Sequence, residues 1–214
     1  MKLAGENRKF IWLMHENGVD SHSIRGVRAG MKRFLSIAGV EDRFVPRYLG
    51  VYRETPHRLV TGELLPHQSI DWYVQEAATH SYDPHGTLNA DTFLNWFMKE
   101  HPDDWVIAVV TQDIYYQMPG ETPDGVEGLA SHDVGVVLST AEHGELTRPQ
   151  RQLVMMLNTI HELGHVAGIM RHCGADCVMK SKWHKGLAEA IRHRPFCERH
   201  LEQLHRCFLK KGGE

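Results

Sequence analysis

A five-residue motif late in the chain combines residue types that bind zinc and activate water. Residues 161–165 read His-Glu-Leu-Gly-His, and in a helix, side chains four positions apart share one face. His161 and His165 can therefore bind one metal ion, while Glu162 can hold a water molecule beside it. This HExxH arrangement is typical of metallopeptidases, in which the glutamate is the general base and zinc lowers the pKa of its water. We therefore predict a hydrolytic zinc site at these three residues.

A third zinc ligand is expected just after the motif, where the helix ends. Gly168 marks that end, and metzincin metallopeptidases place their third histidine three residues after this glycine. That position is Arg171, which stays protonated and cannot be a ligand, and a histidine follows one residue later at His172. Either the turn carries one extra residue and His172 binds, or the site has two histidines, with Asp176 as an alternative carboxylate ligand. We favour His172, because a turn that starts with glycine can accommodate one more residue.

All four cysteines follow the motif, and three of them are spaced like ligands of a second zinc ion. Cys173 and Cys177 have three residues between them, and Cys197 and His200 form a Cys-x-x-His pair. A Cys3His set of this kind makes a closed, tetrahedral, structural zinc site. Such a site would tie the C-terminal helix to the turn after the motif. The alternatives are buried cysteines without a metal, and Cys207 in place of His200 as the fourth ligand.

The same segment resembles the archaemetzincin (archaelysin) family of metzincin zinc metallopeptidases. That family has HExxHxxGxxH followed directly by Cys, then Cys-x-Met, and further on Cys-x-x-Cys. Three parts of this pattern are present here, the first shifted by one residue: His172-Cys173, Cys177-Val178-Met179 and Cys197-x-x-His200. As in the family, 17 residues separate Met179 from Cys197, whereas His200 replaces the last cysteine. The resemblance is specific over residues 150 to 200, and it implies that Met179 is the Met-turn methionine beneath the catalytic zinc.

Apolar spacing and helix caps indicate the elements that must position these residues. Continuous apolar runs predict buried strands at 10–14, 44–52, 105–110 and 134–139. Helices are expected at 21–38, 66–79, 91–100, 150–167, 185–193 and 196–209. Asp20 or Ser21 caps the first of them, and Pro149 opens the helix of the motif. A loop or hairpin is expected at 53–65, a turn at 84–86 and a long loop at 117–128.

Strands and helices alternate over the first 150 residues, which predicts an α/β (α+β) fold with a mixed, mostly parallel sheet. We expect a single metallopeptidase domain over residues 1-214. The resemblance implies a metzincin-like arrangement, with an upper subdomain over about residues 1-168 that includes the active-site helix. It also implies a small helical, zinc-stapled lower subdomain over about residues 169-214, with the substrate cleft between the two. An extended peptide would pair with an edge strand near Val126 to Ser131.

Composition indicates a globular protein and excludes several classes of function. The chain has 214 residues, of which 42% are hydrophobic and 24% charged, so it can bury a core without disulfides. A net charge of −3 argues against a broad nucleic-acid surface, and no apolar stretch approaches the roughly 20 residues that cross a bilayer. No signal peptide is evident, so we expect a cytoplasmic monomer with no nucleic-acid or membrane partner. Twelve of the 16 histidines have no ligand spacing, and we expect them at the surface or in hydrogen bonds.

These patterns predict a zinc-dependent metallopeptidase with one catalytic and one structural zinc ion, acting on peptide or protein substrates. Glu162 would take the proton of the attacking water and pass it to the leaving amine. No cysteine precedes the motif to block the zinc, so a narrow cleft must restrain the enzyme, which favours aminopeptidase-like activity on short peptides. The alternative is a zinc-stabilised binding or scaffold protein with a vestigial, inactive site. The late position of His172 is the feature that supports this alternative.

Overall fold

A computed structural model of the chain describes residues 8–51, 88–90, 94, 104–116, 122, 124–180 and 185–210. The expected helix at 66–79, most of the expected helix at 91–100, and the expected loops at 53–65 and 84–86 lie outside the described residues. None of the helices in the described ranges combines the length and the apolar character that a bilayer-spanning helix needs.

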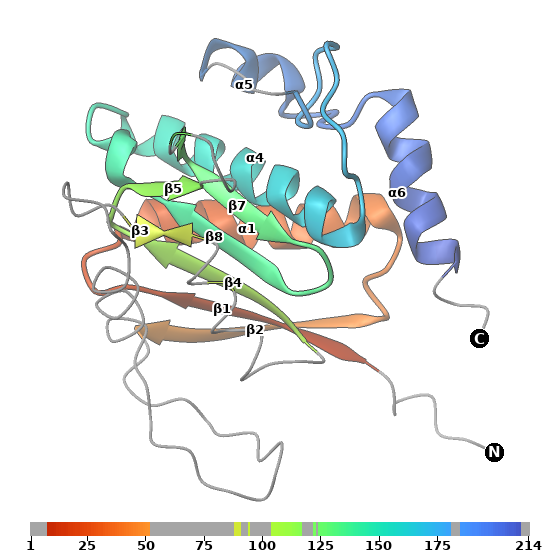
Figure 1. The fold of residues 1–214 in the computed structure, drawn as a ribbon, viewed down its shortest axis with the longest axis horizontal. Helices are drawn as coiled ribbons and strands as arrows, with labels where there is room; N and C mark the ends of the chain where they lie inside the picture. The colour runs from red at the N-terminus through yellow and green to blue at the C-terminus, as the bar shows by residue number, and fades with distance from the viewer. Residues whose placement is uncertain are drawn as a thin grey trace, which may run out of the picture.

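A five-stranded sheet lies at the centre of the molecule (Figure 1). Its strands are β1 (Lys9–His15), β2 (Phe44–Val51), β4 (Trp105–Val110), β7 (Gly128–Ser131) and β8 (Gly135–Ser139). Their spatial order is β2-β1-β4-β8-β7. The first four strands in this order are parallel, whereas β7 pairs antiparallel with β8 at the edge. The four predicted strands and the mostly parallel sheet are therefore confirmed.

The central strand β4 is apolar along its whole length, and both of its faces are covered. All six residues of β4 are buried. Ile107 and Val109 belong to the large core between the sheet and the helices, and Val106, Ala108 and Val110 belong to a second core on the opposite face. This double burial explains why the sequence shows a continuous apolar run at β4 rather than the alternation of a half-exposed strand.

A second, three-stranded sheet corrects part of the sequence prediction. It consists of β3 (Leu88–Asn89), β5 (Ile114–Tyr116) and β6 (Asp124–Val126), in the order β3-β5-β6. The sequence predicted a loop at 117–128, but β6 lies within this range and pairs antiparallel with β5. Short strands of this kind carry too few apolar residues to be recognised locally, because they form through pairing with distant segments.

Helices α1 (Ser21–Ala38) and α4 (Arg148–Ala167) cover one face of the main sheet (Figure 1), and their ends are where the sequence predicts them. The Asp20 carboxylate accepts hydrogen bonds from two backbone N–H groups in the first turn of α1. Pro149 lies in the first turn of α4. Gly39 and Gly168 end the two helices in the left-handed conformation, with φ angles of 67° and 115°. This conformation favours glycine because it has no Cβ.

Two glycines let α1 lie directly against the helix of the motif. A Cβ on Gly26 would meet the Gln152 carbonyl oxygen and lie 2.8 Å from Met155 Cβ, and a Cβ on Gly30 would lie 2.6 Å from the Met156 carbonyl oxygen. Both contacts advance in the same direction along the two helices, so the helices run parallel. The Gly-x-x-x-Gly spacing on α1 therefore determines how closely α1 packs against α4.

The C-terminal segment contains α5 (Lys185–Ile191) and α6 (Glu198–Lys210), as predicted. A short 3-10 helix, η1 (Ala141–His143), precedes α4. Phe208 on α6 packs against aromatic rings from α1 and from two strands, with centroid distances of 6.4 Å to Phe34, 6.0 Å to Phe44 and 6.2 Å to Trp105. The Phe208 carbonyl also accepts a hydrogen bond from Arg43. These contacts anchor the C-terminal helix to the main core.

Candidate metal centres and active site

Three histidine side chains converge at the C-terminal half of α4. The Nε2 atoms of His161 and His165 are 3.1 Å apart, and His172 Nε2 lies 3.2 Å from the second and 3.4 Å from the first. Zinc binds imidazole nitrogen at about 2.0–2.1 Å, so two nitrogens of a tetrahedral site lie about 3.3–3.4 Å apart. The three side chains therefore fit a single zinc ion. The structure brings together the two motif histidines and His172.

The protonation of the rings explains why this cluster needs a cation. The carbonyl oxygens of Val178 and Ile169 accept hydrogen bonds, at 2.6 Å each, from Nδ1 of His161 and His165. A carbonyl only accepts, so both Nδ1 atoms carry the proton, and the two Nε2 atoms present lone pairs to each other. Burial, followed by the neighbouring His165, lowers the pKa of His161 to about 3, so its ring stays neutral. Two lone pairs 3.1 Å apart repel unless a metal ion lies between them.

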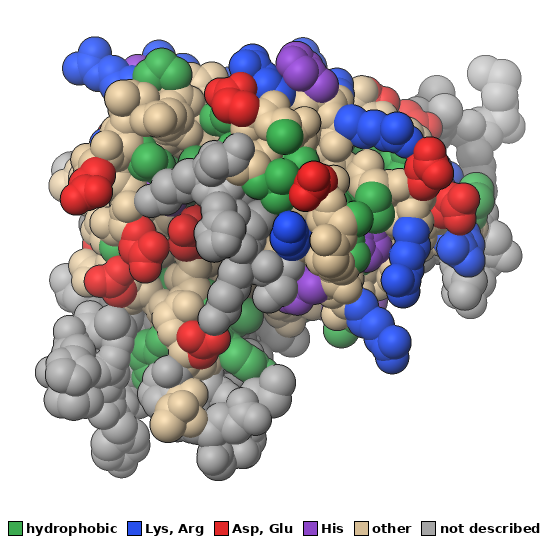
Figure 2. Space-filling view, turned by 90° about the horizontal axis from the view of Figure 1, so that it is seen from above, with side chains coloured by type: hydrophobic (Ala, Val, Ile, Leu, Met, Phe, Trp, Pro, Cys, Tyr) green, Lys and Arg blue, Asp and Glu red, His purple; other side chains and the backbone are tan. Residues whose placement is uncertain are grey.

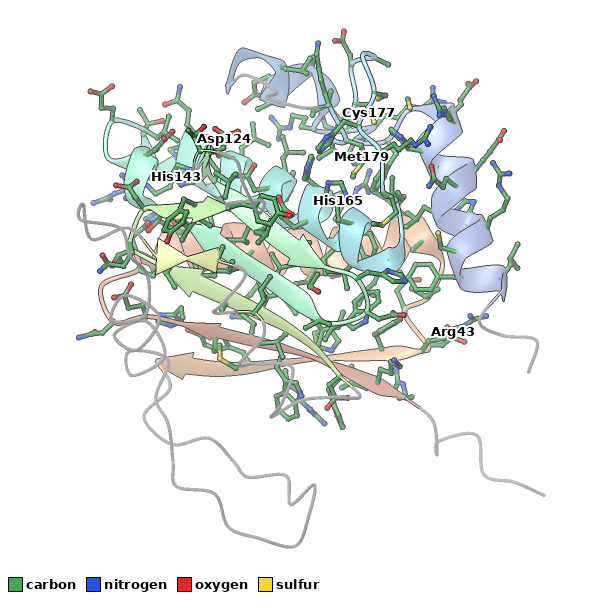
Figure 3. All side chains as sticks on the ribbon, in the orientation of Figure 1. Arg43, Asp124, His143, His165, Cys177 and Met179 are labelled. Atoms are coloured by element: carbon green, nitrogen blue, oxygen red, sulfur yellow. The ribbon has the colours of Figure 1, made fainter. Side chains whose placement is uncertain are left out.

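Met179 lies against the glycine between the two motif histidines. A Cβ on Gly164 would be only 2.8 Å from Met179 Sδ, and the Met179 side chain is fully buried. The preceding residue, Val178, supplies the carbonyl that orients His161. One short segment therefore positions a ligand and fills the space beneath the motif. Figure 3 shows Met179 between the labelled His165 and Cys177.

Glu162 is buried between α4 and the edge strand β7. Its Oε1 atom lies 3.8 Å from His161 Nε2, and its side chain is 10% exposed. Burial raises the pKa of this carboxyl to about 8. The approach to β7 depends on Gly128, because a Cβ there would lie 2.9 Å from Glu162 Oε1. A carboxyl with a raised pKa beside a metal site is suited to accept and return a proton.

The four ligand atoms of Cys173, Cys177, Cys197 and His200 lie within 4.8 Å of one another. The Sγ atoms of Cys177 and Cys197 are 3.4 and 3.6 Å from His200 Nδ1, and a tetrahedral zinc site would place sulfur and nitrogen about 3.6 Å apart. Cys177 and His200 are almost fully buried, and burial raises the pKa of the Cys177 thiol to about 12. A thiolate at such a position requires a cation. The donor set therefore fits a closed structural zinc site, and none of the four cysteines forms a disulfide.

The two candidate metal centres are linked through the loop that carries His172. His200 hydrogen-bonds the backbone of Arg171, the residue before this histidine. Cys173, the residue after it, donates its backbone N–H to the Met179 carbonyl at 3.0 Å. The two alternative ligands that the sequence left open lie elsewhere. Asp176 is exposed and pairs with a lysine, and Cys207 Sγ lies near Gly168, outside both donor groups.

A cleft of about 640 Å³ lies in front of the three histidines. The edge strand β7 forms one wall, and Met170 and Lys180 line it on the side of the C-terminal segment. His172 is exposed, so the histidine site is open, in contrast to the buried cysteine site. An open site keeps a coordination position for water or substrate, which distinguishes catalytic from structural zinc.

The structure also reveals a polar group that the sequence did not indicate. Asn158, one turn before the motif on α4, donates a hydrogen bond at 2.9 Å to the Glu127 carboxylate. His143 lies nearby and is 1% exposed, and neither ring nitrogen has a hydrogen-bond partner within the described residues. The expectation that all remaining histidines lie at the surface or in hydrogen bonds is therefore wrong for His143. Only Asn158 had a local signal, because it lies four residues before Glu162 and shares its helix face.

Comparison with solved structures identifies the fold of this chain. Neither a protein-family model nor a curated protein matches this sequence. The solved structure of an archaemetzincin from Methanopyrus kandleri matches with a TM-score of 0.63 and 20% sequence identity, over 95% of this chain and 97% of that one. The chain has the archaemetzincin fold.

Two further solved structures agree. An archaemetzincin from Archaeoglobus fulgidus, complexed with malonate, matches with a TM-score of 0.57 and 18% identity, over 91% of this chain and 99% of that one. A zinc-dependent peptidase from Methanocorpusculum labreanum matches with a TM-score of 0.52 and 18% identity, over the same shares of the two chains. The metzincin-like fold that the resemblance implied is thus confirmed. At such low identity the likeness extends to the fold, and the chemistry depends on the side chains of this chain.

Proposed function

We propose that this protein is a zinc-dependent metallopeptidase that hydrolyses peptide bonds. The observation that carries the proposal is the convergence of three histidine Nε2 atoms at 3.1–3.4 Å beside a buried carboxyl group. His161, His165 and His172 would hold the catalytic ion, and the Cys3His group would hold a second, structural zinc. The metallopeptidase neighbours that share the fold support the same reading.

The chain's own residues would divide the catalytic work. A bound zinc ion would act as a Lewis acid, polarising the substrate carbonyl and lowering the pKa of water. Glu162 takes the proton of the attacking water and transfers it to the leaving amine. Its raised pKa favours retention of the proton between these two steps, and its burial excludes bulk water from the exchange. Val178 and Ile169 keep His161 and His165 in the tautomer that binds metal through Nε2.

The edge strand β7 provides a means of holding the substrate. It lines the cleft, and among the described residues only one of its two sides pairs, with β8, so we expect the other side to be available for an extended peptide. The segment predicted for this role, Val126 to Ser131, is split in the structure, because Val126 belongs to β6 and β7 begins at Gly128. We propose that short peptides pair with β7, that cleavage is aminopeptidase-like, and that the enzyme acts as a monomer.

The competing reading, a zinc-stabilised scaffold with a vestigial site, depended on the late position of His172. Because the structure brings His172 Nε2 to the other two histidines, this position no longer supports a loss of the site. The Glu162→Ala variant, which tests catalysis, also separates the peptidase from the scaffold protein.

The deciding experiment combines metal analysis with peptide cleavage. We expect two zinc ions per chain in the wild type and in Glu162→Ala, and cleavage of a peptide library by the wild type alone. Glu202→Ala, an exposed change on α6, is the matched control and should leave both readouts unchanged. If Glu162→Ala cleaves as well as the wild type, or if the wild type holds zinc at the Cys3His group alone, the proposal is wrong.

A further inference from the structure

Asn158 is a polar residue at a buried position of α4, where an apolar side chain would pack equally well. It precedes Glu162 by four residues, so the two side chains share the helix face that lines the cleft. Asn158 is 6% exposed. Asparagine is also a poor helix former, because its side chain competes for backbone hydrogen bonds. A residue that breaks the local rules in this way is expected at a functional site.

The Asn158 side chain holds Glu127, the residue that precedes the edge strand β7. Asn158 Nδ2 donates a hydrogen bond at 2.9 Å to Glu127 Oε2. Asp124 and Glu142 line the same cleft, and Figure 2 shows acidic side chains gathered on one side of this surface. Because like charges repel, and because the Glu127 side chain is 39% exposed, its carboxylate would turn toward solvent without a donor on α4. The hydrogen bond therefore ties the start of β7 to α4.

The next residue along the chain brings this strand against the proposed general base. A Cβ on Gly128 would lie 2.9 Å from Glu162 Oε1 and 3.0 Å from its Cγ, so the Gly128 backbone forms the wall on which this side chain rests. In the part of the chain that the structure describes, no hydrogen bond reaches the Glu162 carboxyl, so packing against this wall orients it. If β7 moved away from α4, the carboxyl would gain freedom to rotate.

Two consecutive strand residues therefore contact α4 at points one helical turn apart. Glu127 meets Asn158, and Gly128 meets Glu162, four residues or about 6 Å further along the helix axis. The Glu127 carbonyl also accepts a hydrogen bond at 2.9 Å from the Ser139 N–H, which fixes the same residue to the end of β8. A change at Asn158 is thus transmitted to Glu162 through a short, well-anchored piece of backbone.

We propose that Asn158 is a positioning residue for peptide hydrolysis: through Glu127 it holds Gly128 against Glu162 and so orients the general base. The inference rests on the proposed peptidase function and adds a residue to it that no motif contains. In this role Asn158 acts through the strand and does not touch the reacting atoms. A tie that only stabilises the fold would instead affect unfolding, and a direct contact between Asn158 and the peptide would instead affect KM.

The first test compares Asn158→Leu with the wild type, both zinc-loaded. Leucine branches at Cγ like asparagine, so it removes the hydrogen bond with little change in shape, and the half-exposed Glu127 carboxylate can be hydrated instead. We expect kcat for peptide cleavage to fall by about ten- to hundredfold, as for a misplacement of about 1 Å, and KM to stay within about twofold. The zinc content and the urea midpoint should stay close to those of the wild type.

The second test asks whether Asn158 acts through Glu127. Glu127→Ala should lower kcat as much as Asn158→Leu, and the double variant should be no slower than either single variant. Glu127→Gln keeps an acceptor for Asn158, and a hydrogen bond to a neutral acceptor is about half as strong, so this variant should lose only about three- to tenfold. Glu145→Ala is the matched control: it changes an exposed glutamate outside the described lining of the cleft, and kcat should not change.

Hydrogen exchange of the zinc-loaded proteins monitors the strand without turnover. Backbone amides of residues 128–131 should exchange about tenfold faster in Asn158→Leu, whereas those of α1 should keep their wild-type rates. No cleavage of any peptide by the wild type would overturn the proposed function and this inference with it. If the wild type cleaves peptides but Asn158→Leu keeps its kcat, raises KM alone, or leaves the exchange of 128–131 unchanged, the inference is wrong while the peptidase stands. Additive losses in the double variant would also contradict it.

Discussion

Gly164, between the two motif histidines, should not tolerate a methyl group while Met179 is present. A Cβ on Gly164 would lie 2.8 Å from Met179 Sδ and 3.3 Å from its Cε, and Met179 is fully buried. Because non-bonded heavy atoms are best separated by about 3.5–4.0 Å, the added methyl group would overlap the sulfur by about 1 Å. Because Met179 is 0% exposed, its side chain can move aside only if buried neighbours move with it.

Two opposing effects determine how much Gly164→Ala changes the free energy of unfolding. Alanine favours a helix over glycine by about 1 kcal/mol, whereas overpacking a core costs about 1–3 kcal/mol. We therefore expect Gly164→Ala to lower the free energy of unfolding by up to about 2 kcal/mol. Met179→Ala removes the overlapping sulfur, so in that background Gly164→Ala should raise the free energy of unfolding by about 1 kcal/mol. The sign of the glycine substitution reverses between the two backgrounds.

Urea unfolding of the wild type, the two single variants and the double variant, all zinc-loaded and checked for metal content, measures this coupling. Gly174→Ala is the control, because a Cβ there would meet no atom within 4 Å, and its effect should stay within about 0.5 kcal/mol. If Gly164→Ala has the same effect with and without Met179, the two residues do not pack as described, and the account of what supports the histidine site fails.

Three further predictions test the frame and the ligand set. Gly30→Ala should lower the free energy of unfolding by about 1–3 kcal/mol in urea titrations, since a Cβ there would lie 2.6 Å from a backbone oxygen of α4; unchanged stability would contradict the close helix pair. Burial opposes ionisation of Asp20, but hydrogen bonds from the first turn of α1 and from Arg151 outweigh it and lower its pKa to about 2. Because this folded-state pKa is below the ordinary 3.8, the ionised Asp20 stabilises the fold fully above about pH 4, and this stabilisation is lost as the pH falls through about 2. Asp20→Asn should therefore lower the free energy of unfolding by about 1–2 kcal/mol at pH 7 and by less at pH 3. If the difference in unfolding free energy between the wild type and Asp20→Asn does not narrow at low pH, the lowered pKa of Asp20 is not the source of the stabilisation. By metal analysis, His172→Ala should hold one zinc fewer than the wild type and Arg171→Ala should hold the same number; the reverse pattern would assign the third ligand to the wrong residue.

Local signals were sufficient for the elements whose ends and faces depend on nearby residues. The cap at Asp20, the glycine at residue 39 and the apolar spacing between them define α1 without reference to the rest of the chain. The same holds for α4, where Pro149 and Gly168 lie at its two ends. In both helices the terminal N–H and C=O groups find their partners within one turn, so the sequence alone contains the necessary information.

The contact between Glu127 and Asn158 beside the cleft could not be predicted, because it depends on packing between distant segments. Glu127 reaches Asn158 across 31 positions in sequence, and it does so because β7 lies at the sheet edge beside α4. Residue 128 must be a glycine because the Glu162 carboxyl lies so close to its backbone. Neither segment carries a local sequence pattern that predicts this contact. Residue types that would signal a site, such as a pair of histidines at ligand spacing, are absent from 124–127.

The position of the third histidine shows how a family pattern can shift by one residue without loss of geometry. The segment after α4 is fixed at both of its ends, by the left-handed Gly168 and by Met179 against Gly164. Between these anchors, the Arg171 backbone is bound by His200, and the residue after His172 is bound by the Met179 carbonyl. The extra residue is therefore absorbed within a closed loop and does not move either anchor. Because His172 of the histidine group and Cys173 of the Cys3His group are consecutive residues, the Cys3His group would determine where the proposed catalytic ligand lies.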